Sequence, residues 1–285
     1  MRLTTKIIIG IIGSIFILSL LFIIGFSFSE RKYYTFSNRG FNEINIPQEK
    51  SMGIDIAPFH VVVLEEDRTG IVTEEEVSGI IQIYLSYSGN NSLTLNPITS
   101  GDENRLFIPE ALNGFIVAKT NSDTLTIQIK ADELSKKYKK NLEKEFLSFS
   151  GIHLTLYSSN VNIISKIRGF KTNVCDIETD SIKIDANGDI LIESCKAIDI
   201  DPVWVSNCKL TVQNSMAKTI NLDFDRKGTW SIEECEIEAR NYSGSGRHNI
   251  TLHKNETGTI NWLPKNKDAE LNIKVPGDTA QIVFR

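Results

Sequence analysis

Residues 181–240 decide the fold: SIKIDANGDILIESCKAIDIDPVWVSNCKLTVQNSMAKTINLDFDRKGTWSIEECEIEAR. Pairs of apolar side chains, split by one polar residue, recur here at intervals of mostly eight to ten residues. Each pair puts two apolar side chains on one face of a short strand. The pairs are Ile182/Ile184, Ile190/Ile192, Ile198/Ile200, Leu210/Val212, Ile220/Leu222 and Trp230/Ile232. Two intervals span about twenty residues, so the stretch predicts a regular array of short strands.

The same alternation extends in both directions from this stretch. It continues at Leu154/Leu156 before it and at Ile250/Leu252, Ile260/Trp262 and Leu271/Ile273 after it. Frequent Ile, Val and Thr and scarce Ala favour strands over helices. We therefore predict an all-β domain. Short strands at this spacing suit either a β-solenoid or a β-sandwich, and after Ser150 only Asn187-Gly188 has the sequence of a two-residue hairpin turn.

The cysteines favour the solenoid. Cys175, Cys195 and Cys235 lie in phase with a twenty-residue period, Ser215 occupies the missing position, and Cys208 is out of phase. In a solenoid, each such residue lies above its predecessor, so small side chains stack in an inward ladder. A disulfide is the alternative, because adjacent coils lie about 4.8 Å apart. The fold prediction is a β-solenoid (parallel β-helix-like), with a β-sandwich as the alternative.

One helical insert interrupts the strands, at about residues 132–146. Leu134, Tyr138, Leu142 and Phe146 are spaced four apart, and Asp132 is placed to cap the helix. The remaining positions carry a possible basic surface of Lys136, Lys137, Lys139, Lys140 and Lys144. This surface could meet anionic lipid or an acidic polymer, or the helix could simply pack on the β domain.

Residues 7–26, IIIGIIGSIFILSLLFIIGF, form an uncharged apolar run. At about 1.5 Å per residue, some twenty residues match a bilayer core of about 30 Å. We predict one transmembrane signal-anchor there, after a short tail of residues 1–6 and before a linker of residues 27–40. A cleaved secretory signal is the alternative, with Ser27 and Ser29 as the small residues before the cut. The N-terminus is predicted to be cytoplasmic and the domain of residues 41–285 extracytoplasmic, either periplasmic or at the cell surface.

The charge balance bears on the choice of partner. All 36 acidic residues follow the apolar run, whereas two of the 31 basic residues, Arg2 and Lys6, precede it. The domain therefore carries a net charge of −7. Nucleic acid is excluded as a partner, because phosphate binding requires clustered Lys and Arg.

Several segments resemble a known family in their rhythm and order. FNEINIPQEKSMGIDIAPFHVVVLEED is followed by TLTIQIK, a lysine-rich interruption and SGIHLTLY, and then by repetitive segments such as DSIKIDANGDILIES and AKTINLDFD. The chain resembles bacterial cell-envelope proteins of the putative-adhesin type, including the head GIN-domain group, over most of residues 41–285. The resemblance implies a β-solenoid in the envelope, and it transfers no chemistry.

No motif points to catalysis, a cofactor or a metal. The chain has no HExxH, GxSxG, GxGxxG or GxxxxGK[ST] sequence and no CxxC pair. Acidic residues are plentiful, but Asp199, Asp201, Asp223 and Asp225 alternate with apolar residues, which places them on the solvent face.

These observations predict a membrane-anchored, non-enzymatic cell-envelope protein whose β-solenoid presents a binding or scaffolding surface, as an adhesin does. The expected partners are the membrane, through residues 7–26, and an envelope polysaccharide or protein. Two alternatives remain. One is a glycan-active β-helix enzyme, which would use an acid-lined groove. The other is an envelope-stress or regulatory sensor domain.

Overall fold

The computed structural model describes residues 42–67, 73–76, 79–82, 84–87, 90–98, 104–139, 146–205, 207–225, 228–252 and 258–274. The chain divides into two compact units, Met1–Gly40 and Phe41–Arg285, and all described residues belong to the second. The predicted tail, anchor and linker lie outside the described residues. Within these residues, no helix is long and apolar enough to cross a membrane.

The larger sheet has nine strands in the order β23-β21-β19-β17-β15-β13-β3-β10-β9. All neighbours in it are parallel except the pair β9 and β10. Its strands are β3 (Val61–Glu66), β9 (Ile116–Asn121), β10 (Thr124–Ile129), β13 (Val161–Ser165), β15 (Glu178–Ala186), β17 (Lys196–Trp204), β19 (Met216–Asp223), β21 (Glu236–Gly244) and β23 (Thr259–Pro264).

The second sheet has eight strands in the order β2-β8-β12-β7-β14-β16-β18-β20. It is parallel from β12 to β20 and antiparallel at β2–β8 and β8–β12. Its strands are β2 (Ser51–Asp55), β7 (Asn91–Asn96), β8 (Arg105–Pro109), β12 (His153–Tyr157), β14 (Phe170–Cys175), β16 (Ile190–Glu193), β18 (Lys209–Gln213) and β20 (Thr229–Glu233).

Small elements complete the described part of the domain. A parallel sheet joins β1 (Asn42–Asn45), β11 (Phe146–Ser150) and β6 (Tyr84–Tyr87). Two further pairs are β22 (Arg247–Thr251) with β24 (Glu270–Lys274), parallel, and β4 (Thr73–Glu76) with β5 (Gly79–Gln82), antiparallel. The helices are η1 (Glu110–Leu112) and α2 (Ala131–Lys139). The prediction of a mostly β domain with one α-helix is confirmed for the described residues.

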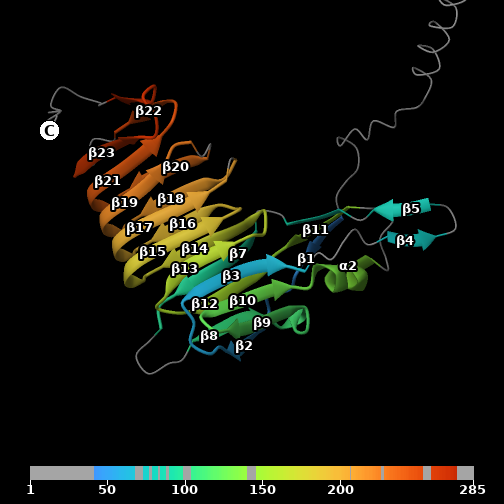
Figure 1. The fold of residues 1–285 in the computed structure, drawn as a ribbon. Coiled ribbons are helices and arrows are strands. Elements are labelled where there is room, and N and C mark those ends of the chain that lie inside the picture. Colours follow the sequence, from blue (N-terminus) through green and yellow to red (C-terminus); the bar gives the residue numbers. More distant parts are fainter. Residues whose placement is uncertain are drawn as a thin grey trace, which may run out of the picture. The chain divides into compact units, whose positions relative to one another are not determined.

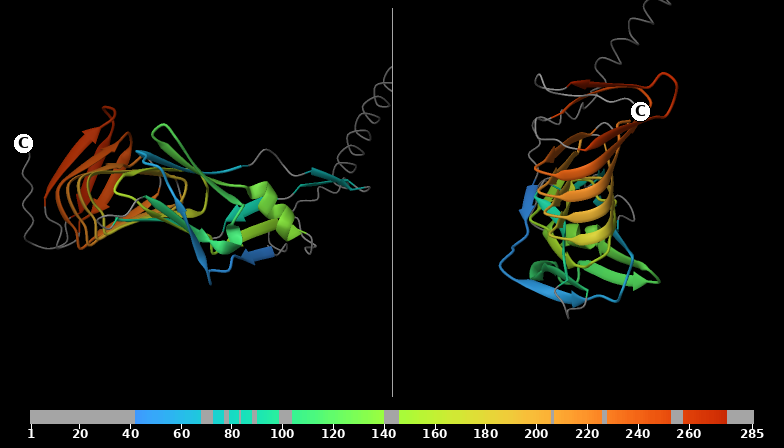
Figure 2. Two further views of the ribbon diagram at one scale, coloured as in Figure 1. Left: turned by 90° about the horizontal axis from the view of Figure 1, so that it is seen from below. Right: turned by 90° about the vertical axis from the view of Figure 1, so that its left-hand side faces the viewer.

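From β13 to β21 the chain alternates between the two large sheets, and each strand pairs in parallel with the strand two elements later (Figure 1). We call one passage through both sheets a coil. The register pairs Ile182 with Ile200 and Ile200 with Ile220, so the first of these steps along the chain is two residues shorter than the second. Figure 2 shows the stacked coils from two further sides. The strand pairs described between residues 175 and 240 are all parallel.

The core lies between the two sheets, where aliphatic side chains from successive coils stack in columns. In the larger sheet one column runs through Ile182, Ile200 and Ile220, all fully buried, and on to Arg240, which is also buried. Burying one such isoleucine contributes about 1.5–3 kcal/mol, so the stacked columns stabilise the coils. The apolar faces of the two sheets are thus buried against each other and form one continuous cluster along the described coils.

Two local predictions were wrong. Ile198 was predicted to share a face with Ile200, but its side chain is 46% exposed, because the strand bends between them as described below. The helix was predicted to reach Phe146, which instead begins β11; residues 140–145 lie outside the described residues, and Asp132 lies in the first turn of α2. A strand that adds to a sheet overrides the weak helical spacing at this point.

Candidate binding groove

The turn from each second-sheet strand to the next larger-sheet strand repeats four times. In each turn one residue adopts a left-handed conformation with φ between 50° and 57°: Asp176, Ser194, Asn214 and Glu234. Short polar residues such as Asp and Asn tolerate this conformation because their side chains bond locally. The N–H of Ser194 donates to the carbonyl of Gln213 on the next coil at 3.1 Å, which locks the turns in register.

The next position of the turn forms a column of Ile177, Cys195, Ser215 and Cys235. The first three are buried, whereas Cys235 is partly buried and also lines the groove described below. Backbone hydrogen bonds fix this register: Lys196 N–H donates to Ile177 O, and Met216 N–H donates to Cys195 O. The structure thus places Cys195 and Cys235 in the predicted ladder with Ser215, but not Cys175. Cys175 pairs in register with Glu193, because its coil is two residues shorter than the predicted repeat.

All four cysteines are free thiols in the structure. Cys195 and Cys235 are two coils apart, about 9.6 Å at the usual strand spacing and too far for a disulfide. Burial raises the pKa of the Cys175 thiol to about 11 and also raises the pKa of Cys195 and Cys235. Thiols with raised pKa values stay protonated at neutral pH and react poorly, which suits a packing role.

Immediately after the turn, the larger-sheet strands β15, β17, β19 and β21 all bend at the same place. The ladder pairs Thr179 with Ala197 and Ser181 with Asp199, but leaves Asp180 and Ile198 unpaired. The same gap recurs between the later strands. The burial pattern changes phase at this bend: Ala197 and Ile200 are buried, whereas Ile198 is exposed and Asp199 is partly exposed, so two successive side chains point outward.

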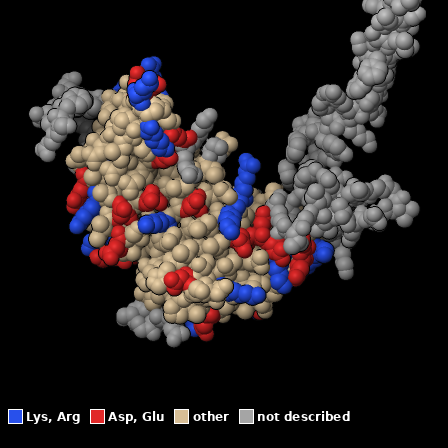
Figure 3. Space-filling model, viewed as in Figure 1, with Lys and Arg blue, Asp and Glu red and all other residues tan. Residues whose placement is uncertain are grey.

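A groove with a volume of about 1170 Å³ crosses these bends. Typical ligand sites measure about 300–1,000 Å³. Its apolar lining includes Ala197, Ile198, Met216, Ala217 and Ile237. Its charged lining is Glu178, Asp180, Lys196, Lys218, Glu236 and Glu238, all exposed. Acidic and basic side chains also lie intermixed over the face that Figure 3 shows.

The groove contains two of the three large hydrophobic side chains that are exposed among the described residues. Three large hydrophobic side chains are exposed among the described residues: Ile198 at 46%, Met216 at 46% and Leu263 at 54%. The first two line the groove and Leu263 does not. An exposed apolar patch rimmed by charge is typical of an interaction site. Sequence reasoning missed this site, because Ile198 looked like a core residue and the bends align only in the folded chain.

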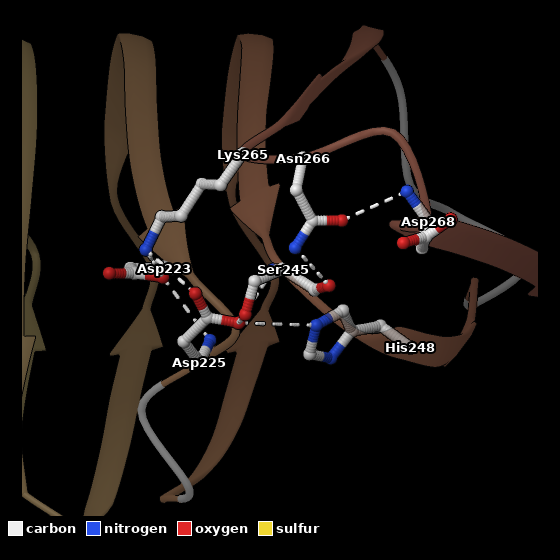
Figure 4. Close-up of polar contacts among 7 residues, drawn as sticks. All are labelled: Asp223, Asp225, Ser245, His248, Lys265, Asn266 and Asp268. Atoms are coloured by element: carbon white, nitrogen blue, oxygen red, sulfur yellow. Dashed lines mark hydrogen bonds and ion pairs between the residues drawn. The ribbon is translucent and has the colours of Figure 1, made fainter.

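A polar cluster lies in the last coils (Figure 4). Its residues come from the end of β19 and the turn after it, from the turn after β21, from β22, and from the turn after β23. The Lys265 ammonium donates to Asp223 Oδ1 at 2.6 Å and to Asp225 Oδ2 at 3.0 Å. Asp225 Oδ1 also accepts from the Ser245 backbone N–H at 2.7 Å and lies 3.6 Å from His248 Nε2. These contacts tie three successive coils together.

The same contacts shift two pKa values. The Ser245 backbone N–H and the Lys265 ammonium together lower the pKa of the Asp225 carboxyl to about 2. The Asp223 and Asp225 carboxylates in turn raise the pKa of Lys265. Both groups are therefore charged across the physiological range, as expected of a structural ion-pair network.

Aromatic rings fill the space between the sheets beside this cluster. The Phe224 ring lies 5.9 Å from Trp230, 4.9 Å from Tyr242 and 6.4 Å from Trp262, measured between ring centroids. Leu222, Tyr242 and Trp262 occupy one register column on successive coils. The rings thus continue the core column through the last coils.

The predicted basic surface is only partly described. Lys136 and Lys137 are exposed on α2, Lys139 ends the helix, and Lys140 and Lys144 lie outside the described residues. The Lys137 ammonium lies 4.7 Å above the Phe115 ring, and Leu134 is buried, so the helix packs against the domain. Tyr138 adds an edge contact to Phe149, with 6.0 Å between ring centroids.

Among the described residues, no group of three or more His, Cys, Asp or Glu side chains is arranged to hold a metal ion.

No protein-family model matches the chain, and no curated protein matches it in sequence. Solved structures do resemble it. A putative adhesin from Bacteroides fragilis NCTC 9343 is 15% identical, with a TM-score of 0.48 over 81% of this chain and 96% of that one. A putative adhesin from Parabacteroides distasonis ATCC 8503 is 13% identical, with a TM-score of 0.47 over 83% of this chain and 98% of that one. Both are putative adhesins, the type that the sequence resembles.

A third structure, of a putative lipid binding protein from Parabacteroides distasonis ATCC 8503, is 11% identical. Its TM-score is 0.36 over 83% of this chain and 98% of that one.

Proposed function

We propose that the protein is a membrane-anchored, non-enzymatic protein of the cell envelope, and that its β domain is a β-solenoid that presents the groove as an adhesin-like binding surface. The observation that carries this proposal is the groove itself, which gathers Ile198 and Met216 onto one exposed site. Charged side chains surround them, so the site combines apolar area for affinity with charge for selectivity.

The registers support the solenoid. The chain alternates between two sheets, and each strand pairs in parallel with the corresponding strand of the next coil. Stacked solenoid repeats produce this arrangement. A sandwich built from hairpins would instead place consecutive strands side by side and antiparallel.

The groove acids favour binding over catalysis. A general acid in a glycosidase usually sits in an apolar environment that keeps its proton near neutral pH. Glu178, Asp180, Glu236 and Glu238 are all exposed to solvent. Their carboxylates are therefore better placed to meet a charged ligand than to transfer a proton.

Binding is tested by comparing Ile198→Asp/Met216→Asp with Leu263→Asp, in which the third exposed hydrophobic residue, outside the groove, is replaced. The full-length variants are reconstituted in nanodiscs, and binding of envelope polysaccharide and envelope protein fractions is measured by biolayer interferometry. We expect the double variant to lose binding at least tenfold and Leu263→Asp to keep it, with similar melting temperatures. Equal binding by both variants would remove the groove from the proposal.

The anchor is tested separately. Residues 7–26 should keep the protein in the membrane fraction after a carbonate wash, since about twenty apolar residues do not leave the bilayer. External protease should digest the β domain in spheroplasts. A soluble form that begins at Glu30 would instead show cleavage after Ser29.

A further inference from the structure

The charged side chains of the groove follow a definite order across its four strands. The outer strands carry acids: Glu178 and Asp180 on β15, and Glu236 and Glu238 on β21. The inner strands carry one lysine each, Lys196 on β17 and Lys218 on β19. Because the larger sheet keeps the order β15, β17, β19, β21, the charge along the groove runs negative, positive, positive, negative.

The lysines remain available to a ligand. Lys196 pairs with Glu178 at 2.9 Å, but the two side chains are 61% and 74% exposed. An ion pair this exposed contributes little free energy, so the carboxylate of a ligand can replace Glu178 beside Lys196 with little loss of free energy.

The dimensions of the groove set the length of the occupant. Neighbouring strands lie about 4.8 Å apart, so the two acidic strands are about 14 Å from each other. An extended chain advances about 3.3 Å per residue, so about five residues cover that distance. Side chains at the first, third and fifth positions then point to the same face.

The lining favours a polypeptide over a polysaccharide. None of the described residues that line the groove is aromatic, so they offer sugar rings no aromatic face to stack on. An acidic polysaccharide carries charge of one sign and would be repelled by the four acids at the two ends. A peptide can present both signs in the required order, and Ile198 and Met216 can contact the aliphatic stems of its charged side chains.

We propose that the groove binds an extended peptide segment of about five residues that lies across the strands, with an acidic residue at its centre and a basic residue at each end. This inference rests on the proposed function, since it names the partner of the same groove. The carboxylate of the central acidic residue contacts Lys196 and Lys218, and the basic side chains at the two ends contact the acids of β15 and β21.

The test uses two blocked, fluorescent peptides, Gly-Lys-Val-Glu-Val-Lys-Gly and its charge-reversed partner Gly-Glu-Val-Lys-Val-Glu-Gly. Each is titrated with the full-length protein in nanodiscs and followed by fluorescence polarisation at low salt. We expect at least tenfold tighter binding of the acid-centred peptide, and loss of that preference in about 0.5 M salt, where charges are screened beyond a few Å.

A matched pair of variants assigns the preference to the groove. Lys218→Glu should abolish the preference, whereas Lys183→Glu makes the same change of charge on the exposed side of β15, outside the groove lining, and should leave it intact. Melting temperatures of both variants verify that they fold. If Lys183→Glu weakens binding as much as Lys218→Glu, the preference reflects net charge and the inference fails.

The remaining outcomes separate this inference from the proposed function. If both peptides bind equally, the groove does not read the order of charges and the inference is overturned. If neither peptide binds but a polysaccharide does, and Ile198→Asp/Met216→Asp abolishes its binding, the groove function stands and the peptide inference fails. If nothing binds, both fail.

Discussion

Replacing Ser215 by alanine should destabilise the stack of coils through a single hydroxyl. Ser215 Oγ accepts the Cys195 backbone N–H at 3.1 Å and donates to Gln213 O at 2.8 Å, and the side chain is only 2% exposed. Alanine leaves the buried N–H of Cys195 without its acceptor, which costs about 1–3 kcal/mol. With a urea m-value of about 2–3 kcal/mol/M, the unfolding midpoint should fall by about 0.3–1.5 M.

Ser165→Ala is the matched control. Ser165 is also 2% exposed, but its Oγ has no hydrogen-bond partner among the described residues. Removing an unpartnered hydroxyl from the core relieves a desolvation cost, so this variant should be as stable as the parent or slightly more stable. Urea unfolding of both variants, followed by circular dichroism, makes the comparison. Equal losses of stability would refute the role assigned to the Ser215 hydroxyl.

Three further changes test other parts of the fold. Gly188→Ala should lower stability by about 1–3 kcal/mol in urea unfolding, because the added Cβ would lie 1.8 Å from Phe170 O, whereas Gly246→Ala meets nothing closer than 3.9 Å and should be tolerated. The pKa of Asp225 is lowered from 3.8 to about 2, so its contribution to the free energy of unfolding is complete above about pH 4 and is lost as the pH falls towards 2. Between pH 4 and 2, Asp225→Asn should therefore lose less stability than the parent. If both proteins lose the same amount of stability over that range, the ion-pair network does not stabilise the fold. The Asn241 side-chain amide donates to Asn221 Oδ1 and accepts from Asn261 Nδ2, both at 2.8 Å. Asn241→Ala removes both hydrogen bonds and should lower the melting temperature of the domain by a few degrees, since each bond contributes about 1 kcal/mol.

The strands of the domain could be predicted from the sequence because burial on one face leaves a period of two. Pairs such as Ile190/Ile192 and Leu210/Val212 lie in strands and are buried as predicted. The length of each coil was harder to predict from the sequence. The cysteine spacing predicted a constant period of twenty, yet the coil from Ile177 to Cys195 is two residues shorter, so Cys175 falls outside the ladder. A missing pair of residues in one coil leaves no trace in the alternation, since it preserves which face each side chain points to.

The groove could not be predicted in this way. It depends on four bends that lie beside one another only after the coils stack, and on charges that come from strands of four successive coils, β15 to β21. Ile198 carries the same local signal as a core isoleucine, and only the bend in β17 turns its side chain outward. The acids on β21 are exposed, and their position three strands from the acids of β15 follows from the tertiary register alone.

The equal step from Cys195 to Ser215 and from Ser215 to Cys235 makes residues 195–214 an interchangeable module. Both ends of this segment occupy the same place in the turn, so a tandem duplication would insert one complete layer and leave every neighbouring register unchanged. The groove would become about 4.8 Å longer and gain one more lysine-bearing strand. Copying one such module would thus lengthen the groove without any change in the packing of the core.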